Sequence, residues 1–591
     1  MRFGSAFVAP SIHAAIAAAL IGLLPAAAVH AADEPAVIAA VAVDPYADLK
    51  KQAKWVGAQI DQPTLDGFLE SFIMMATQFK GLAGLDVNRP AGVVVTAEGP
   101  AGVPVPRGFV PVKDLAKLLA ALQGVIGPAQ EQDGVRVISP PGMPPIQIVE
   151  KDGWAIFAQQ GSPDAPAGLE QALDPIVKAF SLGVQVFPAR MPEGMRKQLE
   201  ALLQQAAAMQ AQRGQPVDAD ALQAGLKNLA DVETILIGAN VDTADERIYL
   251  ENRFAMVPGS AGGSLYAEMA KAVLSTPTAA TADGKPAAIA GHAAVAIPAS
   301  LREAAKALLV QALPVSNRVE TPNGFSETTV SEPANTVFTL VRQVVPAMLD
   351  AGGIDAAVTI DTAAAEMAEG KALPAVTAGM KVKDGAALEA DLEAALGAKN
   401  ALPAGVSVKF DAGKAGPANL HVVEIDMAGN EGSLRRVLGE KLAMTLAVTP
   451  SHAFIVLGGD VEKRIAAATA GAAAKPDANA KPFAGLDVSL ASLVAYAAGT
   501  QKIATPEDAG GIALATEAAE AATALPSSLV QLLMRPIDRG MATRLSADGG
   551  AIKLVKTLVE MRSGAVQPQP AGFGPGAAPK GRPIPLPGLA P

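Results

Sequence analysis

The chain of 591 residues contains no cysteine. This absence excludes disulfides, a lipid-modified N-terminal cysteine, thiol catalysis, iron–sulfur clusters and cysteine-ligated zinc. Charged residues make up only 18% of the chain, below the usual fraction of about a quarter, and aromatic residues make up 4%. The formal charge is −11 and no basic run is present. We therefore expect no binding to nucleic acid, which depends on clustered lysine and arginine.

Histidine is scarce as well, and beyond residue 31 only His292, His421 and His452 remain. His421 and His452 each begin a candidate strand, and one interpretation is a shared metal site. A third ligand and the usual ligand spacing are missing, so we expect both to be surface residues at strand ends. We place His292 in a loop. The chain also lacks a phosphate-binding glycine loop and an EF-hand sequence.

The first 31 residues have the pattern of a cleavable signal peptide. Arg2 supplies positive charge, residues 14–24 are apolar, and residues 29–31 fit a cleavage site after Ala31. The apolar stretch is shorter than the roughly 20 residues that span a bilayer, although an uncleaved anchor is the alternative. We therefore predict a periplasmic or secreted protein without a membrane span after signal removal.

A helix, an aspartate and a strand are expected twice, over residues 68–95 and 337–358. A lysine–aspartate step then opens a second helix each time, at Lys113-Asp114 and at Lys383-Asp384. Aspartate at a helix start caps free amide groups, which explains the step without a functional site. Trp154 aligns with Ala453 in a second pair of strands. The recurrence predicts an internally duplicated chain.

Alternating apolar residues over 247–254 predict a strand that leaves the turn at 242–246. We align it with a second strand beginning near Ile552, after a turn at 546–550. The fold class we predict is α+β, internally duplicated, with mainly antiparallel curved sheets and helices packed on one face. The expected segments are the signal peptide (1–31), an alanine-rich spacer without regular structure (32–44), a first α+β copy (45–280), a connecting strand–helix segment and linker (281–325), a second copy (326–562) and a Pro/Gly-rich disordered tail (563–591).

Three runs carry a resemblance to a known group of proteins: NRPAGVVV (residues 88–95), GFVPVKDLAKLLAAL (108–122) and DGWAIFA (152–158). The chain resembles exported, alanine-rich proteins of unknown function from planctomycete-type bacteria. Its layout is also similar to duplicated bacterial families of unknown function that pair curved sheets with helices. The resemblance covers most of the chain in outline and implies no substrate, cofactor or site residue.

The remaining candidate residues each have a structural interpretation that we prefer. Asp86 and Asp355 are either an acid or cation-ligand pair or turn residues that bind nearby amides, and we expect turns. Ser260 lacks a nucleophile-elbow sequence, and we expect Ser264 to cap the helix that follows. Trp154 is expected in the core, and so are residues 72–75 and Phe79, although methionines can also line an apolar cavity.

We predict a non-catalytic, exported cell-envelope protein with a structural or protein-interaction role. The alternatives are a carrier of an apolar or lipid-like ligand and a hydrolase that uses only Asp and Glu. No catalytic, cofactor-binding or metal-binding residue and no cofactor is predicted. The expected partner is either an envelope protein or the apolar ligand. The PIPLP motif of the tail can bind to a groove on such a protein.

Overall fold

The computed structural model describes residues 35–565, apart from 99–101, 133–134, 141–143, 213–228, 278–286, 313–316, 322–323, 329–343, 369–370, 398–401, 403–404, 428–432 and 474–482. The expected signal peptide, its cleavage site after Ala31 and almost all of the expected tail lie outside these residues. Residues 563–565, the first three of the expected tail, belong to a helix.

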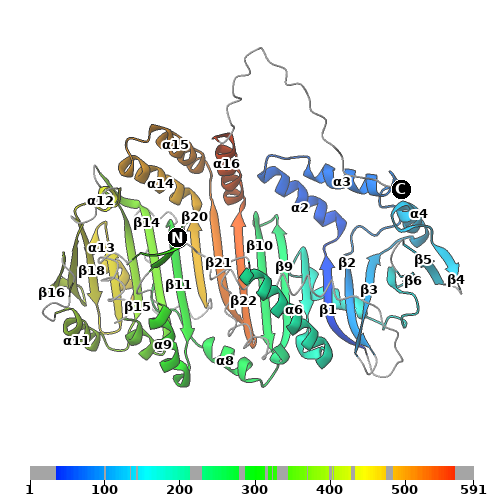
Figure 1. Ribbon diagram of the computed structural model, residues 1–591, viewed down its shortest axis with the longest axis horizontal. Helices are drawn as coiled ribbons and strands as arrows, with labels where there is room; N and C mark the ends of the chain where they lie inside the picture. Colours follow the sequence, from blue (N-terminus) through cyan, green and yellow to red (C-terminus); the bar gives the residue numbers. More distant parts are fainter. Residues whose placement is uncertain are drawn as a thin grey trace, which may run out of the picture.

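Twenty strands of the described chain form one antiparallel sheet that does not close on itself (Figure 1). The fold class is therefore α+β, as predicted. From edge to edge the order is β16 (Val406–Ala415), β17 (Ala418–Asp426), β18 (Lys441–Val448), β19 (His452–Leu457), β15 (Lys371–Lys381), β14 (Gly353–Ala368), β11 (Ile289–Ala296), β20 (Ala484–Ser489), β21 (Leu529–Ile537), β22 (Gly540–Asp548), β10 (Arg247–Met256), β9 (Val232–Asp242), β8 (Leu182–Val186), β1 (Ala36–Val43), β2 (Ala91–Glu98), β3 (Val103–Pro111), β7 (Trp154–Gln159), β6 (Ile146–Lys151), β5 (Val135–Ile138) and β4 (Gln130–Gln132). A separate hairpin joins β12 (Asn317–Thr321) to β13 (Gly324–Thr328).

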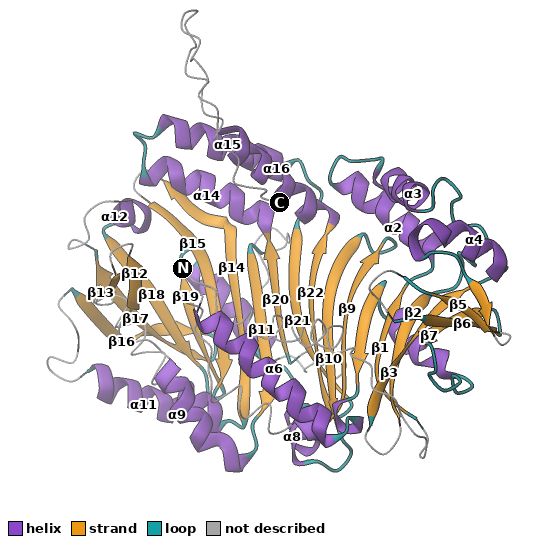
Figure 2. Cartoon of the chain, turned by 45° about the vertical axis from the view of Figure 1, so that its right-hand side comes forward, coloured by secondary structure: helices purple, strands orange, loops and turns teal. Residues whose placement is uncertain are grey.

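Helices line both ends of the strands (Figures 1 and 2). Along the upper edge lie α2 (Tyr46–Gln59), α3 (Leu65–Ala76), α4 (Leu115–Ile126), α14 (Leu490–Ala504), α15 (Ala509–Thr523) and α16 (Gly549–Ala565). Along the lower edge lie α8 (Ala261–Met269), α9 (Arg302–Ala312) and α11 (Gly385–Leu396). Further helices are α5 (Asp174–Val177), α6 (Glu193–Gln212), α12 (Ser433–Leu438) and α13 (Val461–Ala473), and residues 344–350 are also helical.

The expectation that helices cover only one face of the sheet is wrong. On one face of β7, Trp154 and Ile156 share a core with Leu173, which precedes α5, and with Ile176 of α5. On the other face, Ala155 shares a core with Leu118 of α4. Neighbouring strand residues point to opposite faces, so α5 and α4 lie on opposite faces. In the second half, β19 is covered in the same way by α13 on one face and α11 on the other.

The expected spacer contributes a strand to the middle of one half of the sheet. Ala36–Val43 forms β1, which pairs with β2 and with β8. Alanine has a low strand propensity, and this misled the prediction. Ala40 and Ala42 are fully buried, and their small size allows Leu173 and Ile176 to pack closely over the strand. The segment assigned to the connection likewise supplies β11, between β14 and β20.

The second expected strand of the aligned pair is a helix. The first, β10, forms as predicted and follows a turn in which Asp242 accepts hydrogen bonds from the amides of Ala244 and Asp245. Residues 552–558 instead belong to α16, which begins where Asp548 accepts a hydrogen bond from the Ala551 amide. Ala551 and Leu554 are buried three residues apart, which is helical spacing.

Candidate functional site

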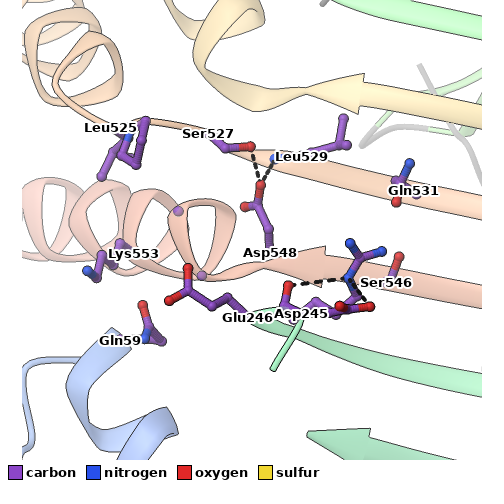
Figure 3. A pocket seen from close by; sticks show the side chains of 14 residues that line it. Gln59, Asp245, Glu246, Leu525, Ser527, Leu529, Gln531, Ser546, Asp548 and Lys553 are labelled. Carbon is purple, nitrogen blue, oxygen red and sulfur yellow. Dashed lines mark hydrogen bonds and ion pairs between the residues drawn. The ribbon is translucent and has the colours of Figure 1, made fainter. Parts of the chain in front are cut away.

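A pocket of about 340 Å³ opens at the upper end of the central strands, between α2 and α16 (Figure 3). Its floor comes from β21, β22 and β10, and Gln59 and Lys553 contribute from the two helices. The lining is mostly polar and charged: Gln59, Asp245, Glu246, Arg247, Ser527, Gln531, Ser546, Asp548 and Lys553, with the backbone of Gly549 and Gly550 and the side chains of Leu525, Pro526 and Leu529.

Two of the three acidic side chains of this pocket, Asp548 and Asp245, have structural partners. Asp548 accepts hydrogen bonds from the amide of Leu529 at 2.9 Å and from the amide of Ala551 at 2.7 Å. Its carboxylate also accepts a hydrogen bond from Ser527. Asp245 lies 4.0 Å from Arg247. No histidine lines the pocket. The pocket is suited to binding a polar molecule.

His421 is buried, contrary to the expected surface position. Its Nε2 lies 3.1 Å from the Glu389 carboxylate of α11, and its Nδ1 accepts a hydrogen bond from the Asp411 amide. The ring also packs edge-on against Phe410. Glu389 comes from a helix and His421 from β17, so the pair depends on packing that a strand-end position in the sequence does not reveal.

His452 is also buried, and it stands beside Ser275 and Asp355. Asp355 is a residue of β14, and it accepts hydrogen bonds from the hydroxyl of Ser275 and from the amides of Ser275 and Thr276. The turn interpretation of Asp355 is therefore wrong, because its donors lie about 80 residues earlier in the chain. The Ser275 Oγ is 3.4 Å from the His452 Nε2.

This trio does not have the order of a catalytic triad. In a triad the histidine lies between the serine and the carboxylate, whereas here Ser275 lies between Asp355 and His452. The Ser275 hydroxyl is already donated to Asp355. Burial lowers the pKa of His452, although the charge of Asp355 opposes this effect. The arrangement fixes the end of the first half, Ser275 and Thr276, onto β14 of the second.

His292 lies within β11 rather than in a loop, opposite Gly485 of β20. Its Nε2 is buried and has no hydrogen-bond partner among the described residues. Burial lowers the pKa of His292. The three histidines belong to β11, β17 and β19 and do not converge. No group of three His, Asp or Glu side chains in the described chain is arranged to hold a metal ion.

Several preferred interpretations are confirmed. Asp86 accepts a hydrogen bond from the Asn88 amide, as in a turn, and lies 3.6 Å from Lys113. Asp114 and Asp384 cap α4 and α11 by accepting hydrogen bonds from the amides three residues later. Trp154 is buried, with Phe109 edge-on at 6.0 Å.

The interpretation of Ser260 needs one correction. Ser260 itself caps α8, where its side chain accepts a hydrogen bond from the Gly263 amide. The expectation that Ser264 forms this cap is wrong. The helix therefore starts four residues earlier than the sequence suggested, and the hydroxyl of Ser260 serves the helix end.

The expectation that residues 72–75 and Phe79 fill the core is wrong. Phe68, Phe72, Met75 and Phe79 expose 69%, 57%, 67% and 79% of their surface. The spacing of four and three residues places Phe68, Phe72 and Met75 along one side of α3, and Phe79 follows in the turn after the helix ends at Ala76. Leu65, Leu69 and Ile73, on the adjacent side of the helix about a quarter turn away, are only partly exposed. The apolar stripe of α3 is therefore wider than the part that is covered, and its exposed part has no partner in the described chain. We call Phe68, Phe72, Met75 and Phe79 the α3 face.

The comparisons with known proteins return nothing similar: no family model, no curated protein sequence and no solved structure matches this chain. Among the described helices none is long and apolar enough to cross a membrane. The functional argument therefore depends on the surfaces described above.

Proposed function

We propose that the protein is an exported, non-catalytic scaffold of the cell envelope that binds a protein partner through the α3 face. The exposure of Phe68, Phe72, Met75 and Phe79 carries the proposal. Burying one such side chain contributes about 1.5–3 kcal/mol, and four together offset much of the free-energy cost of association. Phe79 is further held outward by a left-handed backbone, with φ at 65°, a conformation uncommon for a side chain of this size.

The charge around the α3 face favours a protein partner over a lipid surface. Asp66 lies on the same helix, Glu70 of that helix is paired with Lys50, and the whole chain has a net charge of −11. Helices that bind anionic membranes carry lysine and arginine on their polar side instead. Aromatic residues and methionine are enriched at protein interfaces. An apolar patch on an envelope protein is the matching partner.

Site-specific photocrosslinking in the native cells tests this proposal. A benzophenone amino acid placed at Phe72 or Met75 is expected to yield one discrete protein adduct. The control position is Val559 of α16, which is apolar and 58% exposed on the same edge of the sheet. Equal adducts from Val559, adducts to lipid alone, or no adduct from the α3 face would contradict the proposal.

A substitution experiment complements the crosslinks. The double variant Phe72→Ser and Phe79→Ser should abolish co-purification of the crosslinked partner while leaving the melting temperature unchanged. Val555→Ser with Val559→Ser is the matched control, because both valines are at least half exposed. Retention of the partner by the first variant would show that the α3 face does not bind it.

We further infer that the chain arose by duplication of a ten-strand unit. Outward from β10 the strands run β9, β8, β1, β2, β3, β7, β6, β5 and β4. Outward from β22 they run β21, β20, β11, β14, β15, β19, β18, β17 and β16. Strands at corresponding positions of the two series follow one another in the same order along the chain. Agreement over nine successive positions supports duplication of the whole unit.

A carrier of an apolar ligand has less support. Apolar ligands bind in concave sites lined mainly by hydrophobic and aromatic side chains. The pocket between α2 and α16 has the size for a small ligand, but nine of its fourteen lining residues are polar or charged. Mass spectrometry of the protein purified from its native envelope distinguishes the two functions. Stoichiometric lipid without a protein partner would favour the carrier.

A further inference from the structure

Three arginines meet one buried glutamate in the middle of the sheet, a feature independent of the α3 face. We propose that Arg253, Arg535 and Arg544 form a binding site for an oxyanion group, a phosphate or a carboxylate, carried by a small polar ligand. The site lies where β10 of the first half pairs with β22 of the second. β10 contributes Glu251 and Arg253, whereas β21 and β22 contribute the other two arginines.

The glutamate has no exposed surface and binds all three arginines. Its Oε1 accepts hydrogen bonds from the Nε of Arg253 and, at 3.2 Å, from the Nη2 of Arg535. Its Oε2 accepts a hydrogen bond from the Nε of Arg544. Burial alone would raise the pKa of Glu251, but the hydrogen bonds from Arg253 and Arg544 outweigh burial and lower it. Glu251 is therefore ionised at neutral pH.

One carboxylate against three guanidinium groups leaves two positive charges in excess. The excess is notable in a chain whose net charge is −11. Like charges this close repel one another, and a bound anion relieves the repulsion. A purely structural ion pair would need only one arginine for Glu251.

The guanidinium groups are held in place and keep donors available. Arg544 stacks over the Tyr249 ring at 4.1 Å, and Arg253 lies 5.2 Å from the Phe180 ring. Each of these two arginines uses only its Nε toward Glu251, so their terminal Nη groups have no acceptor in the part of the chain that is described. Arg535 exposes 42% of its side chain. Pairs of such N–H groups match the geometry of phosphate and carboxylate.

The pocket between α2 and α16 lies on the same face of the sheet and has room for the rest of the ligand. Ser546 lines the pocket and is two residues from Arg544 along β22, so both side chains point to one face about 7 Å apart. Gln531 pairs with Ser546 and also lines the pocket (Figure 3). The serine hydroxyl and the glutamine amide favour a ligand with hydroxyl or amide groups beside its oxyanion.

Calorimetric titration of the full chain with inorganic phosphate and with citrate, at low ionic strength and pH 7, tests the site. The wild type should bind at least one of the two anions, and Arg535→Gln should weaken that binding by about tenfold, through loss of one charged hydrogen-bond donor. Tighter binding of phosphate or of citrate identifies the preferred oxyanion. Arg435→Gln is the matched control, because Arg435 is also 42% exposed and paired to one glutamate. It should bind like the wild type.

Absence of binding of both anions to the wild type at concentrations up to about 10 mM would overturn the proposal. Equal binding by Arg535→Gln and the wild type would also overturn it. A second variant, Glu251→Gln, removes the carboxylate that competes with the ligand. If circular dichroism shows it folded, its anion affinity should rise severalfold. An unchanged or lower affinity in the folded variant would assign the cluster to structure alone.

Discussion

Glu251 on β10 lies directly opposite Arg544 on β22 and accepts a hydrogen bond from its side chain, although 293 positions separate the two residues in the chain. The contact joins the two halves of the sheet at its centre, where β10 and β22 run side by side (Figure 1). It places the buried Glu251 carboxylate, paired with a partly exposed arginine, at the seam on which the continuity of the sheet depends.

Replacing Glu251 by alanine should destabilise the folded protein by about 1.5–3 kcal/mol, the usual contribution of a hydrogen bond to a charged group. The variant leaves three arginines, whose side chains are 29%, 42% and 29% exposed, without the buried carboxylate that they share. Urea unfolding followed by tryptophan fluorescence measures the effect. Arg435→Ala, which breaks an exposed pair with Glu440, should cost less than about 1 kcal/mol. Equal losses for the two variants would show that the central pair is not buried as described.

The stability should decrease as the pH falls from 7.5 to 5.5, in part because of His292 and His452. Burial lowers the pKa of both histidines below the ordinary value of 6.5. Below pH 6.5 the unfolded chain therefore binds protons that the folded chain does not, and protonation favours unfolding. The double variant His292→Asn and His452→Asn should lose less in melting temperature over this range than the wild type. Parallel curves for the two proteins would contradict the assignment.

Truncating a phenylalanine of α3 should change the stability much less than truncating a phenylalanine of the core. Phe72 is exposed, and Phe72→Ala should change the free energy of unfolding by less than about 0.5 kcal/mol. Phe454 of β19 is 1% exposed within the core beneath α13, and Phe454→Ala should cost about 3–5 kcal/mol. Denaturant unfolding of both variants gives the comparison. A large loss for Phe72→Ala would mean that the α3 face is covered in the protein alone.

Two glycines should also respond in opposite ways to alanine. At Gly238 of β9, a Cβ atom would lie 2.1 Å from the Cγ of the buried Phe180, so Gly238→Ala should lower the melting temperature. At Gly67 of α3, a Cβ atom would meet nothing within 4 Å. Gly67→Ala should therefore stabilise the helix by up to about 1 kcal/mol. Differential scanning fluorimetry distinguishes the two directions, and stabilisation by Gly238→Ala would contradict the packing of Phe180.

Local signals in the sequence predicted local structure correctly. Asp114 and Asp384 begin helices because an aspartate can satisfy amides three residues later, which requires no distant partner. The alternation in residues 247–254 is likewise a property of the strand itself. Such features depend on a few adjacent residues, and the amino-acid order contains all the information needed.

Errors arose where a distant contact decides between two local possibilities. Residues 36–43 are alanine-rich and form a strand because β2 and β8 are available on either side. Residues 552–558 alternate like a strand, yet Asp548 and the buried Ala551 and Leu554 make them a helix. The burial of His421 depends on Glu389, and that of His452 on Ser275.

The amino-acid sequence by itself determined the absence of thiol chemistry, the α+β class, the helix caps and the turn before β10, because composition and short-range hydrogen bonds suffice for each. Only the tertiary structure decided that twenty strands join in one sheet, that the α3 face stays exposed, and that Glu251 gathers three arginines. Those outcomes depend on which apolar surfaces find partners and on which charges meet across strands hundreds of residues apart. No local pattern encodes either one, since the same apolar helix or arginine would look identical in the sequence whether buried or exposed.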